Sequence, residues 1–367
     1  MNVGVLGAGQ LGRMLAIAGQ SLDARFRFLD PNPDSPVRDV GELRVAPYDD
    51  AAELERFAEG LDVVTYEFES IPIGAVEAVA KHVPVFPPVQ ALRVAQDRVL
   101  EKRCFQHTGI RTAPSRDVAS RGDLEKAAHE IGLPAVLKTR RFGYDGKGQV
   151  VVRGEDELAG AWDTLGGVPL ILEQFVEFDR ELSIIGARGR DGGIVFYPLV
   201  ENEHDNGILA CSFAPADVTD AKTKTACDYV RRMMSGFDYV GVLTLEMFES
   251  GDKLIANEIA PRVHNSGHWT IEGAQTSQFE NHVRAIMGKE LGPAAAVGHS
   301  VMLNVLGAAP DMSRIESVPD AKVHMYGKAP APRRKLGHVT VCGDDPREVR
   351  ERGASLRQIL EPERVPA

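Results

Sequence analysis

Short apolar runs alternate with helical patterns along the first part of the chain. Buried strands are predicted at VGVL (3–6), FRFL (26–29), DVVTY (62–66) and VPVF (83–86), with helices between them that include 51–59 and 74–81. Alternation of this kind predicts a doubly wound parallel sheet. Pro87 and Pro88 then end the unit, because consecutive prolines interrupt both helices and sheets.

Beyond the prolines, the pattern predicts one long helix over 90–107 and then a succession of strands and helices. Strands are expected at 134–140, 170–176, 181–189, 192–204, 239–249 and 253–260, with helices near 155–165 and 217–236. After about residue 300, short strand signals are separated by Pro and Gly turns.

Composition narrows the class of protein. The 367 residues suggest two or three domains at ~100–200 residues each. Lys and Arg number 42 and Asp and Glu 53, a net charge of −11, which argues against a general nucleic-acid binder. No apolar run reaches the ~18 residues of a membrane helix, and the first residues lack the basic start of a signal peptide. The four cysteines show no C-x-x-C spacing, so we expect reduced thiols in a cytoplasmic protein and no zinc site.

The first chemical motif is a glycine-rich turn, VLGAGQLGRM, after the first strand. Gly7, Gly9 and Gly12 allow a tight turn whose helix-start N–H groups can approach an anion. Asp30 ends the second predicted strand, where a dinucleotide-binding fold carries its ribose ligand. A nicotinamide-dependent dehydrogenase is therefore one hypothesis, although such a turn suits any phosphate.

A second glycine-rich segment follows Lys138. RFGYDGKG (141–148) is suited to fold over a triphosphate while its N–H groups and Lys138 neutralise the charge, and it is not a Walker A loop. In isolation the same residues also suit a flexible hairpin turn.

Two carboxylates lie in consecutive apolar strands. Two antiparallel strands joined by the ESGD turn can bring Glu246 and Glu258 to one face, as Mg²⁺ with substrate phosphates requires. Asn257 could add an oxygen ligand only if the strand twists there. Pairing with a cation is the alternative role for each glutamate.

Polar residues gather in APRVHNSGHWT (260–270), directly after the second of these strands. Arg262 is suited to brace an oxyanion, and His264 is a candidate general base with an unperturbed pKa of about 6.5. A structural histidine is the alternative. Three basic clusters, Lys102-Arg103, Arg140-Arg141 with Lys147, and Arg333 to Lys335, are suited to attract anionic substrates, although solvated surface charge is the simpler expectation for Lys102-Arg103.

The chain resembles the ATP-grasp superfamily and, within it, the ligases of purine biosynthesis that form N5-carboxyaminoimidazole ribonucleotide. The similarity spans nearly the whole chain and rests on QLGRM (10–14), GYDGKGQ (143–149), FYPLVENEH (196–204), NEIAPRVHNSGHWT (257–270), YGK (326–328) and RKLGH (334–338). It implies an α/β fold of four parts: an N-terminal Rossmann-like parallel-sheet domain (1–95), a central ATP-grasp lobe with the glycine-rich lid (96–172), a second lobe with the metal site (173–298), and a small C-terminal β-rich domain (299–367).

The resemblance also implies roles for single residues. It places ATP against Arg98, Lys138, Gly143, Tyr144, Asp145, Gly146, Lys147, Gly148, Gln149, Glu173, Gln174, Phe175, Val176, Glu181, His204, Asn257 and Glu258. It places the ribonucleotide against Gly9, Gln10, Leu11, Glu67, Asp145, Lys328 and Arg334, with a monophosphate at the first glycine turn and with Arg333 and Lys335 as alternatives to Arg334. It assigns Mg²⁺ to Glu246 and Glu258, and the chemistry to Arg262, His264 and Asn265.

The implied reaction converts ATP, bicarbonate and aminoimidazole ribonucleotide to ADP, phosphate and the carboxylated product, through carboxyphosphate. The implied protein is a cytoplasmic homodimer with Mg²⁺ as cofactor and with neither nucleic acid nor a membrane as partner. Two alternatives stay open: an ATP-grasp carboxyl- or formyl-transfer enzyme acting on another purine ribonucleotide, and a non-catalytic nucleotide-binding module, against which the Glu246–Glu258 pair speaks.

Overall fold

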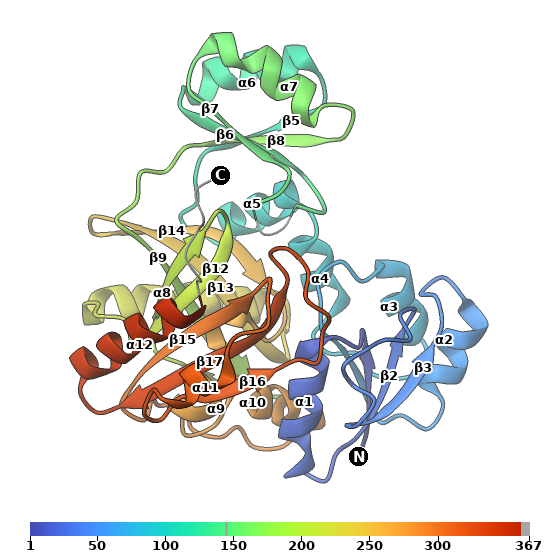
Figure 1. The fold of residues 1–367 in the computed structure, drawn as a ribbon. Helices are drawn as coiled ribbons and strands as arrows, with labels where there is room; N and C mark the ends of the chain where they lie inside the picture. The colour runs from blue at the N-terminus through green and yellow to red at the C-terminus, as the bar shows by residue number, and fades with distance from the viewer. Residues whose placement is uncertain (144–145, 361–367) are drawn as a thin grey trace.

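The structure, a computed structural model, describes residues 1–143 and 146–360, which form three β-sheets with helices packed around them (Figure 1). Two of the sheets have four strands and the third has nine. The predicted mixed α/β fold is confirmed.

The N-terminal domain is a parallel sheet of order β3-β2-β1-β4. Its elements are β1 (Asn2–Leu6), α1 (Gln10–Gln20), β2 (Arg25–Asp30), β3 (Glu42–Val45), α2 (Ala51–Ala58), β4 (Val63–Tyr66) and α3 (Ile73–Val79). The strand predicted at 83–86 is wrong, because only Val85 forms a bridge, to Val64 of β4. The strand β3 has no fully buried residue, which explains why its apolar signal was too weak to predict it.

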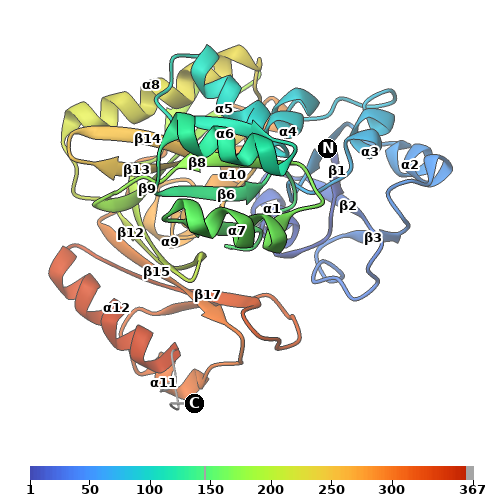
Figure 2. The ribbon, with the colours of Figure 1, turned by 90° about the horizontal axis from the view of Figure 1, so that it is seen from above.

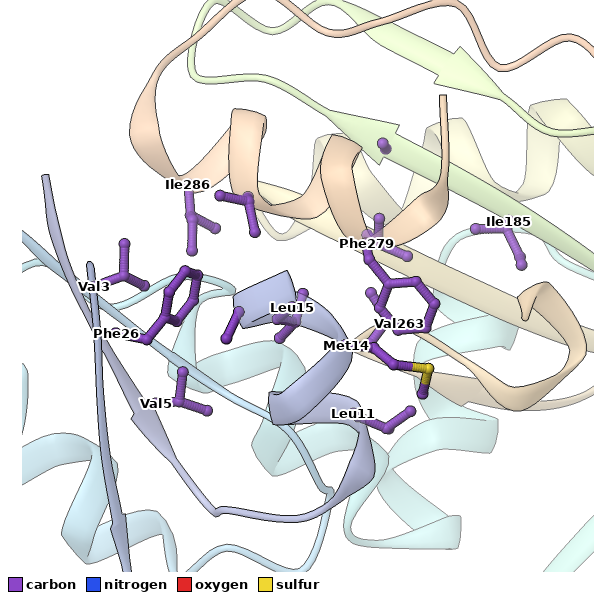
Figure 3. Packing of buried hydrophobic residues seen from close by; sticks show 14 of the residues in the cluster. Val3, Val5, Leu11, Met14, Leu15, Phe26, Ile185, Val263, Phe279 and Ile286 are labelled. Carbon is purple, nitrogen blue, oxygen red and sulfur yellow. The ribbon is translucent and has the colours of Figure 1, made fainter. Parts of the chain in front are cut away.

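Helix α1 joins this domain to the rest of the protein. Leu11, Met14 and Leu15 lie between the β1–β2 side chains and helix α10 (Gln278–Met287), whose Phe279 and Ile286 are buried in the same cluster (Figure 3). Burying such side chains stabilises the contact by about 1.5–3 kcal/mol each. The glycine turn at the start of α1 is therefore held firmly beside the large sheet.

The helix predicted over 90–107 is wrong as a single element. It is divided into α4 (Val89–Ala95) and α5 (Arg98–His107). Asp97 causes the break, because its carboxylate accepts the N–H groups of Val99 at 3.0 Å and Leu100 at 3.3 Å and so starts a new helix.

The lid is the second four-stranded sheet, of order β5-β8-β6-β7 and antiparallel throughout. Its elements are β5 (Ser115–Val118), α6 (Arg121–Ile131), β6 (Ala135–Thr139), β7 (Gln149–Val152), η1 (Glu155–Glu157), α7 (Leu158–Leu165) and β8 (Leu170–Gln174). Figure 1 shows it standing apart at the top with α6 and α7 on its outer side, and Figure 2 shows it from above, lying over the large sheet. The glycine-rich segment connects β6 to β7.

The large sheet has the order β14-β13-β9-β11-β12-β15-β17-β16, with β10 paired to β9. The strands after residue 299 continue this sheet, because β15 pairs with β12. Its elements are β9 (Arg180–Arg188), β10 (Ile194–Phe196), β11 (Val200–Asp205), β12 (Ile208–Ala214), α8 (Asp220–Gly236), β13 (Gly241–Ser250), β14 (Lys253–Ala260), η2 (Asn265–Gly267), α9 (Thr270–Gly273), β15 (His299–Leu306), α11 (Met312–Glu316), β16 (Lys322–Met325), β17 (Lys335–Gly343) and α12 (Pro346–Leu360).

Both faces of the central strand β9 are buried, with alternate side chains on opposite sides. Leu182 and Ile184 belong to the apolar cluster that includes α8, whereas Ile185 and Ala187 belong to the cluster that includes α10. Within the described ranges, none of the helices has the length and apolarity needed to cross a bilayer.

Candidate functional site

A cavity of about 360 Å³ lies where the N-terminal domain, the lid and the large sheet meet. Its lining includes these predicted site residues: Gln10, Leu11, Glu67, Arg98, Gly143, His204, Glu246, Glu258, Arg262, His264 and Asn265. Lys335, left open as a phosphate ligand, lines it too. Arg140 and Arg141 of the second basic cluster also line it. The other predicted site residues that the structure describes lie outside this lining, and Tyr144 and Asp145 fall outside the described residues.

The two glutamates of the predicted metal pair are direct partners in the sheet. Glu246 of β13 stands opposite Glu258 of β14, and cross-strand neighbours have Cβ atoms about 4.5–5.5 Å apart. The register shifts next to this pair, so Met247 faces Ala256 and Asn257 is the extra residue. Such a local irregularity of the strand is what Asn257 needs in order to add an oxygen ligand beside Glu258.

Each glutamate has a nitrogen donor beside it. Arg98 Nη1 lies 3.1 Å from Glu258 Oε2, and His264 Nε2 lies 2.9 Å from Glu246 Oε1. Burial disfavours the ionised Glu246 carboxylate, but its neighbours, His264 first and then His204 and Arg262, together hold the pKa of Glu246 below its usual range. Within the described residues there is no group of three or more His, Cys, Asp or Glu that could hold a metal by itself. Two carboxylates suit a Mg²⁺ ion that arrives with nucleotide phosphates. Phosphate and water oxygens would be the remaining ligands of that ion.

A buried charge cluster lies on the lid side of the site. Lys138 Nζ is 2.9 Å and Lys102 Nζ 3.3 Å from the same oxygen of Glu173. Burial alone would raise the pKa of Glu173, but the two ammonium groups lower it to about 2. Lys102 also donates to the carbonyl of Asn257 at 2.7 Å. The expectation that Lys102 is solvated surface charge is wrong, since only 3% of its side chain is exposed, whereas its neighbour Arg103 is exposed.

Sequence reasoning missed Glu101, which lies on α5 beside this cluster. Burial raises the pKa of Glu101 to about 8, and one of its oxygens accepts the N–H of Ile259 at 2.7 Å. A signal existed, because residues three and four positions after Arg98 share its helix face. Glu101 and Lys102 therefore point toward the same site as Arg98.

The described part of the glycine-rich segment lies over the site. Arg98 Nη2 donates to the carbonyl of Gly143 at 3.2 Å, and Thr139 donates to the carbonyl of Gly148 at 2.8 Å. A Cβ at Gly146, where φ is +75°, would lie 2.9 Å from the carbonyl oxygen of Asn206 in the β11–β12 turn. The segment thus rests against the large sheet, with the exposed Lys147 beside Gly146 and Gln149 at the start of β7.

The predicted nucleotide hinge follows at the end of β8. The main-chain N–H of Gln174 donates to the carbonyl of Pro114 at 2.9 Å, and that of Phe175 donates to the carbonyl of Pro134 at 3.1 Å. These two hydrogen bonds anchor the segment before Val176. Further along, Glu181 Oε1 is 3.1 Å from His204 Nδ1. Burial lowers the pKa of His204, but Glu181 and Glu246 more than offset this and raise it.

The first glycine turn holds carboxylates that belong to the protein itself. Glu67 accepts the N–H groups of Gly9 and, at 2.7 Å, of Gly12. Asp30 accepts the N–H of Ala8 at 3.0 Å and lies 3.2 Å from the Tyr48 hydroxyl. Glu67 thus already accepts the N–H groups of Gly9 and Gly12, and the monophosphate expected at this glycine turn stays a prediction.

The polar loop after β14 lines the cavity with Arg262, His264 and Asn265. Arg262 pairs with Glu69 at 2.9 Å, and the amides of Asn265 and Asn304 exchange two hydrogen bonds, at 3.0 and 2.7 Å. Neither Glu69 nor Asn304 was predicted, because they come from segments without a motif.

The C-terminal basic segment reaches the N-terminal domain. Lys328 donates to Gln10, Arg333 donates to the carbonyl of Asn206 at 2.7 Å, and the exposed Arg334 donates to Ala329 at 3.0 Å within its own loop. Arg333 is thus engaged by the β11–β12 turn, whereas the Arg334 guanidinium donates within its own loop.

Three family models match successive parts of the chain. They describe a ribonucleotide synthetase preATP-grasp domain at residues 1–96, an ATP-grasp domain at 103–279, and a phosphoribosylaminoimidazole carboxylase C-terminal domain at 300–352.

Individual proteins match over nearly the full length. The N5-carboxyaminoimidazole ribonucleotide synthase of Pseudomonas aeruginosa is 50% identical over 98% of this chain and 100% of its own. The crystal structure of N5-carboxyaminoimidazole ribonucleotide synthetase from Thermus thermophilus matches with a TM-score of 0.95 and 50% identity, covering 99% of this chain and 100% of that one. The Aspergillus clavatus synthase in complex with ADP and 5-aminoimidazole ribonucleotide matches with a TM-score of 0.90 and 34% identity, over 98% of each chain.

Proposed function

Since the chain belongs to the N5-carboxyaminoimidazole ribonucleotide synthase family of ATP-grasp ligases, we propose how its cavity performs that family's reaction. The reaction is the ATP-dependent carboxylation of 5-aminoimidazole ribonucleotide to N5-carboxyaminoimidazole ribonucleotide in purine biosynthesis.

ATP binds between the lid and the large sheet. Arg98, Lys102 and Lys138 supply three positive charges on the lid side, where the phosphates must be neutralised. Gln174 to Val176 receive the adenine, and Glu181 accepts the ribose hydroxyls, for which a carboxylate is a good acceptor. Glu246 and Glu258 would hold Mg²⁺, which would supply neutralisation of phosphate charge there.

Bicarbonate is the carbon source. Its oxygen attacks the γ-phosphorus, ADP leaves, and carboxyphosphate forms. Arg262, beside Glu258 in the cavity, stabilises the negative charge of this intermediate. The exocyclic amine of the ribonucleotide then attacks the carbonyl carbon, phosphate leaves, and the amine loses a proton. The lid shields the intermediate from water.

The ribonucleotide binds on the side of the N-terminal domain. Gln10, Leu11 and Glu67 line the cavity there, and Lys328 and Arg334 bring positive charge from the C-terminal segment. Because Glu67 occupies the glycine turn, the 5′-phosphate belongs with the C-terminal cations.

The observation that carries this mechanism is that ATP-site, metal-site and substrate-site residues, widely separated in sequence, line one cavity. Turnover in ¹⁸O-labelled bicarbonate tests it. Heavy oxygen is expected in the released phosphate, provided that exchange with water is kept short. Unlabelled phosphate alongside carboxylated product would overturn the carboxyphosphate route. A reaction that ran with formate and not with bicarbonate would overturn the choice of carbon source.

We also propose a cytoplasmic homodimer. The four cysteines are unpaired, and burial raises the pKa of Cys104 to about 11, so the thiols suit a reducing compartment. Sedimentation equilibrium is expected to give twice the chain mass of 39.9 kDa.

A further inference from the structure

Four polar side chains form a buried row behind His264. Ser212 lies on β12, Asn202 on β11, Ser183 on β9 and Ser266 in η2, and none is more than 6% exposed. Neighbouring members are 2.8–2.9 Å apart, and Ser266 Oγ is 2.9 Å from His264 Nδ1. Polar groups buried this deeply are retained only when they are hydrogen-bonded.

The hydrogen bonds of this row run in one direction. Ser212 donates to the amide oxygen of Asn202, and the Asn202 amide nitrogen donates to Ser183. Ser183 thus accepts one hydrogen bond and donates its hydroxyl hydrogen to Ser266. Ser266 is in turn left with its hydroxyl proton to donate to His264 Nδ1.

A main-chain group fixes the end of the row. The N–H of Ser266 points at His264 Nδ1 from 3.3 Å, and a main-chain N–H can only donate. Nδ1 is therefore an acceptor, and the ring proton sits on Nε2, 2.9 Å from Glu246. Gln278 holds the histidine backbone by accepting its N–H at 2.9 Å and donating to its carbonyl at 2.6 Å.

We propose that His264 is a positioning residue: the buried row from Ser212 to Ser266 fixes its Nε2–H tautomer, and that N–H steers the Glu246 carboxylate toward the cation that accompanies ATP. This inference rests on the proposed function for the identity of the nucleotide and its cation. It assigns His264 a role other than general base, because Nδ1 is engaged by two donors and Nε2 carries the proton. Partners of metal-ligating carboxylates change metal affinity about 10–100-fold when removed.

Nitrogen NMR tests the tautomer without any turnover. In protein labelled with ¹⁵N-histidine, the His264 signals are assigned by their loss in His264→Gln. Nδ1 is expected at the shift of an unprotonated ring nitrogen and Nε2 at that of a protonated one. In Ser266→Ala, which removes the hydroxyl donor and keeps the main-chain N–H, the Nδ1 signal is expected to shift because Nδ1 accepts one hydrogen bond fewer, whereas the buried control Ser300→Ala leaves both signals in place. A protonated Nδ1 in the unaltered protein would overturn the proposal.

Metal affinity tests the role. Mn²⁺ binding in the presence of ADP, followed by electron paramagnetic resonance, is expected to weaken about 10–100-fold in His264→Ala. His264→Gln is expected to recover most of that loss, because its amide N–H can replace Nε2–H. If Gln binds Mn²⁺ no better than Ala, the positioning role is wrong. The positioning role is also wrong if His264→Gln keeps its Mn²⁺ affinity but loses kcat at saturating Mg²⁺. Loss of a general base would lower kcat in this way.

The nitrogen NMR and Mn²⁺-binding measurements need neither bicarbonate nor the ribonucleotide. Failure of the proposed function would instead appear as an unaltered protein that releases no phosphate in response to those two substrates. The two failures are therefore distinguishable.

Discussion

At the scale of single residues, three carboxylates of the site each have a nitrogen donor of a side chain beside them. Glu258 faces Arg98, Glu246 faces His264, and Glu173 faces Lys138. The apolar strands around them singled out Glu246 and Glu258 in the sequence, whereas Glu173 was named only through the family resemblance. The sequence did not predict the pairs, because they depend on which strand ends beside which helix.

We expect Glu258→Gln to fold normally and to lose metal-dependent turnover, because a neutral amide is a poorer Mg²⁺ ligand than a carboxylate. Phosphate release measured against Mg²⁺ concentration checks this, with circular dichroism as the test of folding. Glu249→Gln is the matched control: it removes a carboxylate of the neighbouring strand β13, paired with Arg180 and Lys222, without changing the Mg²⁺ dependence. Near-normal activity of Glu258→Gln at limiting Mg²⁺ would contradict the metal role.

A pH dependence of stability follows from Glu101. Its pKa of about 8 in the folded protein exceeds the ordinary value of 4.5, so the folded state binds the extra proton between these values. The stability that this group contributes is complete below about pH 4.5 and is lost as pH rises through about 8. Glu101→Gln keeps the acceptor for Ile259 without the charge. We expect urea denaturation to show that, from pH 6 to pH 9, the free energy of unfolding of Glu101→Gln rises relative to that of the unaltered protein. The rise is up to ~1.4 kcal/mol for each pH unit. If the difference in free energy of unfolding between the two proteins did not change with pH, the raised pKa of Glu101 would be contradicted.

At the scale of elements, α1 shows what a motif predicts and what it leaves open. The strand, turn and helix around Gly7, Gly9 and Gly12 form as the spacing indicates. The anion at the turn is nevertheless supplied by Glu67, which follows the end of β4. A sequence cannot show this, because the carboxyl end of a neighbouring parallel strand reaches the turn only once the sheet has formed.

We therefore expect no nicotinamide binding at this turn. Glu67 occupies N–H groups that a pyrophosphate would need, and Asp30 already accepts the N–H groups of Ala8 and Asn32. Titration with NADH, followed by its fluorescence, is expected to show no saturable binding. Micromolar binding that purine nucleotides do not displace would contradict this interpretation of the turn.

At the scale of the whole molecule, local patterns predicted most strands but not how the sheets are assembled. The run over 192–204 became β10 and β11 with Pro198 between them, and the tail strands joined the large sheet through β15 and β12. Such pairings join segments far apart in sequence, and their register depends on which faces are buried together. The cavity arises only from this assembly, since Gln10, Glu258 and Lys335 lie on different elements.

That assembly predicts separate effects on the two substrates. Arg334 lies in the segment that carries Lys328 to Gln10, away from the buried Lys102–Lys138–Glu173 cluster on the ATP side. Arg334→Ala should remove one charged hydrogen bond to the ribonucleotide phosphate, a loss of roughly 1.5–3 kcal/mol. The KM for the ribonucleotide should therefore rise about 10–150-fold, while the KM for ATP stays in place.

Arg333→Ala is the matched control, because Arg333 is engaged by the carbonyl of Asn206. Steady-state kinetics with each substrate varied in turn give the comparison. Equal losses for both substrates would indicate a general structural defect, and a loss confined to Arg333→Ala would transfer the phosphate contact to that residue.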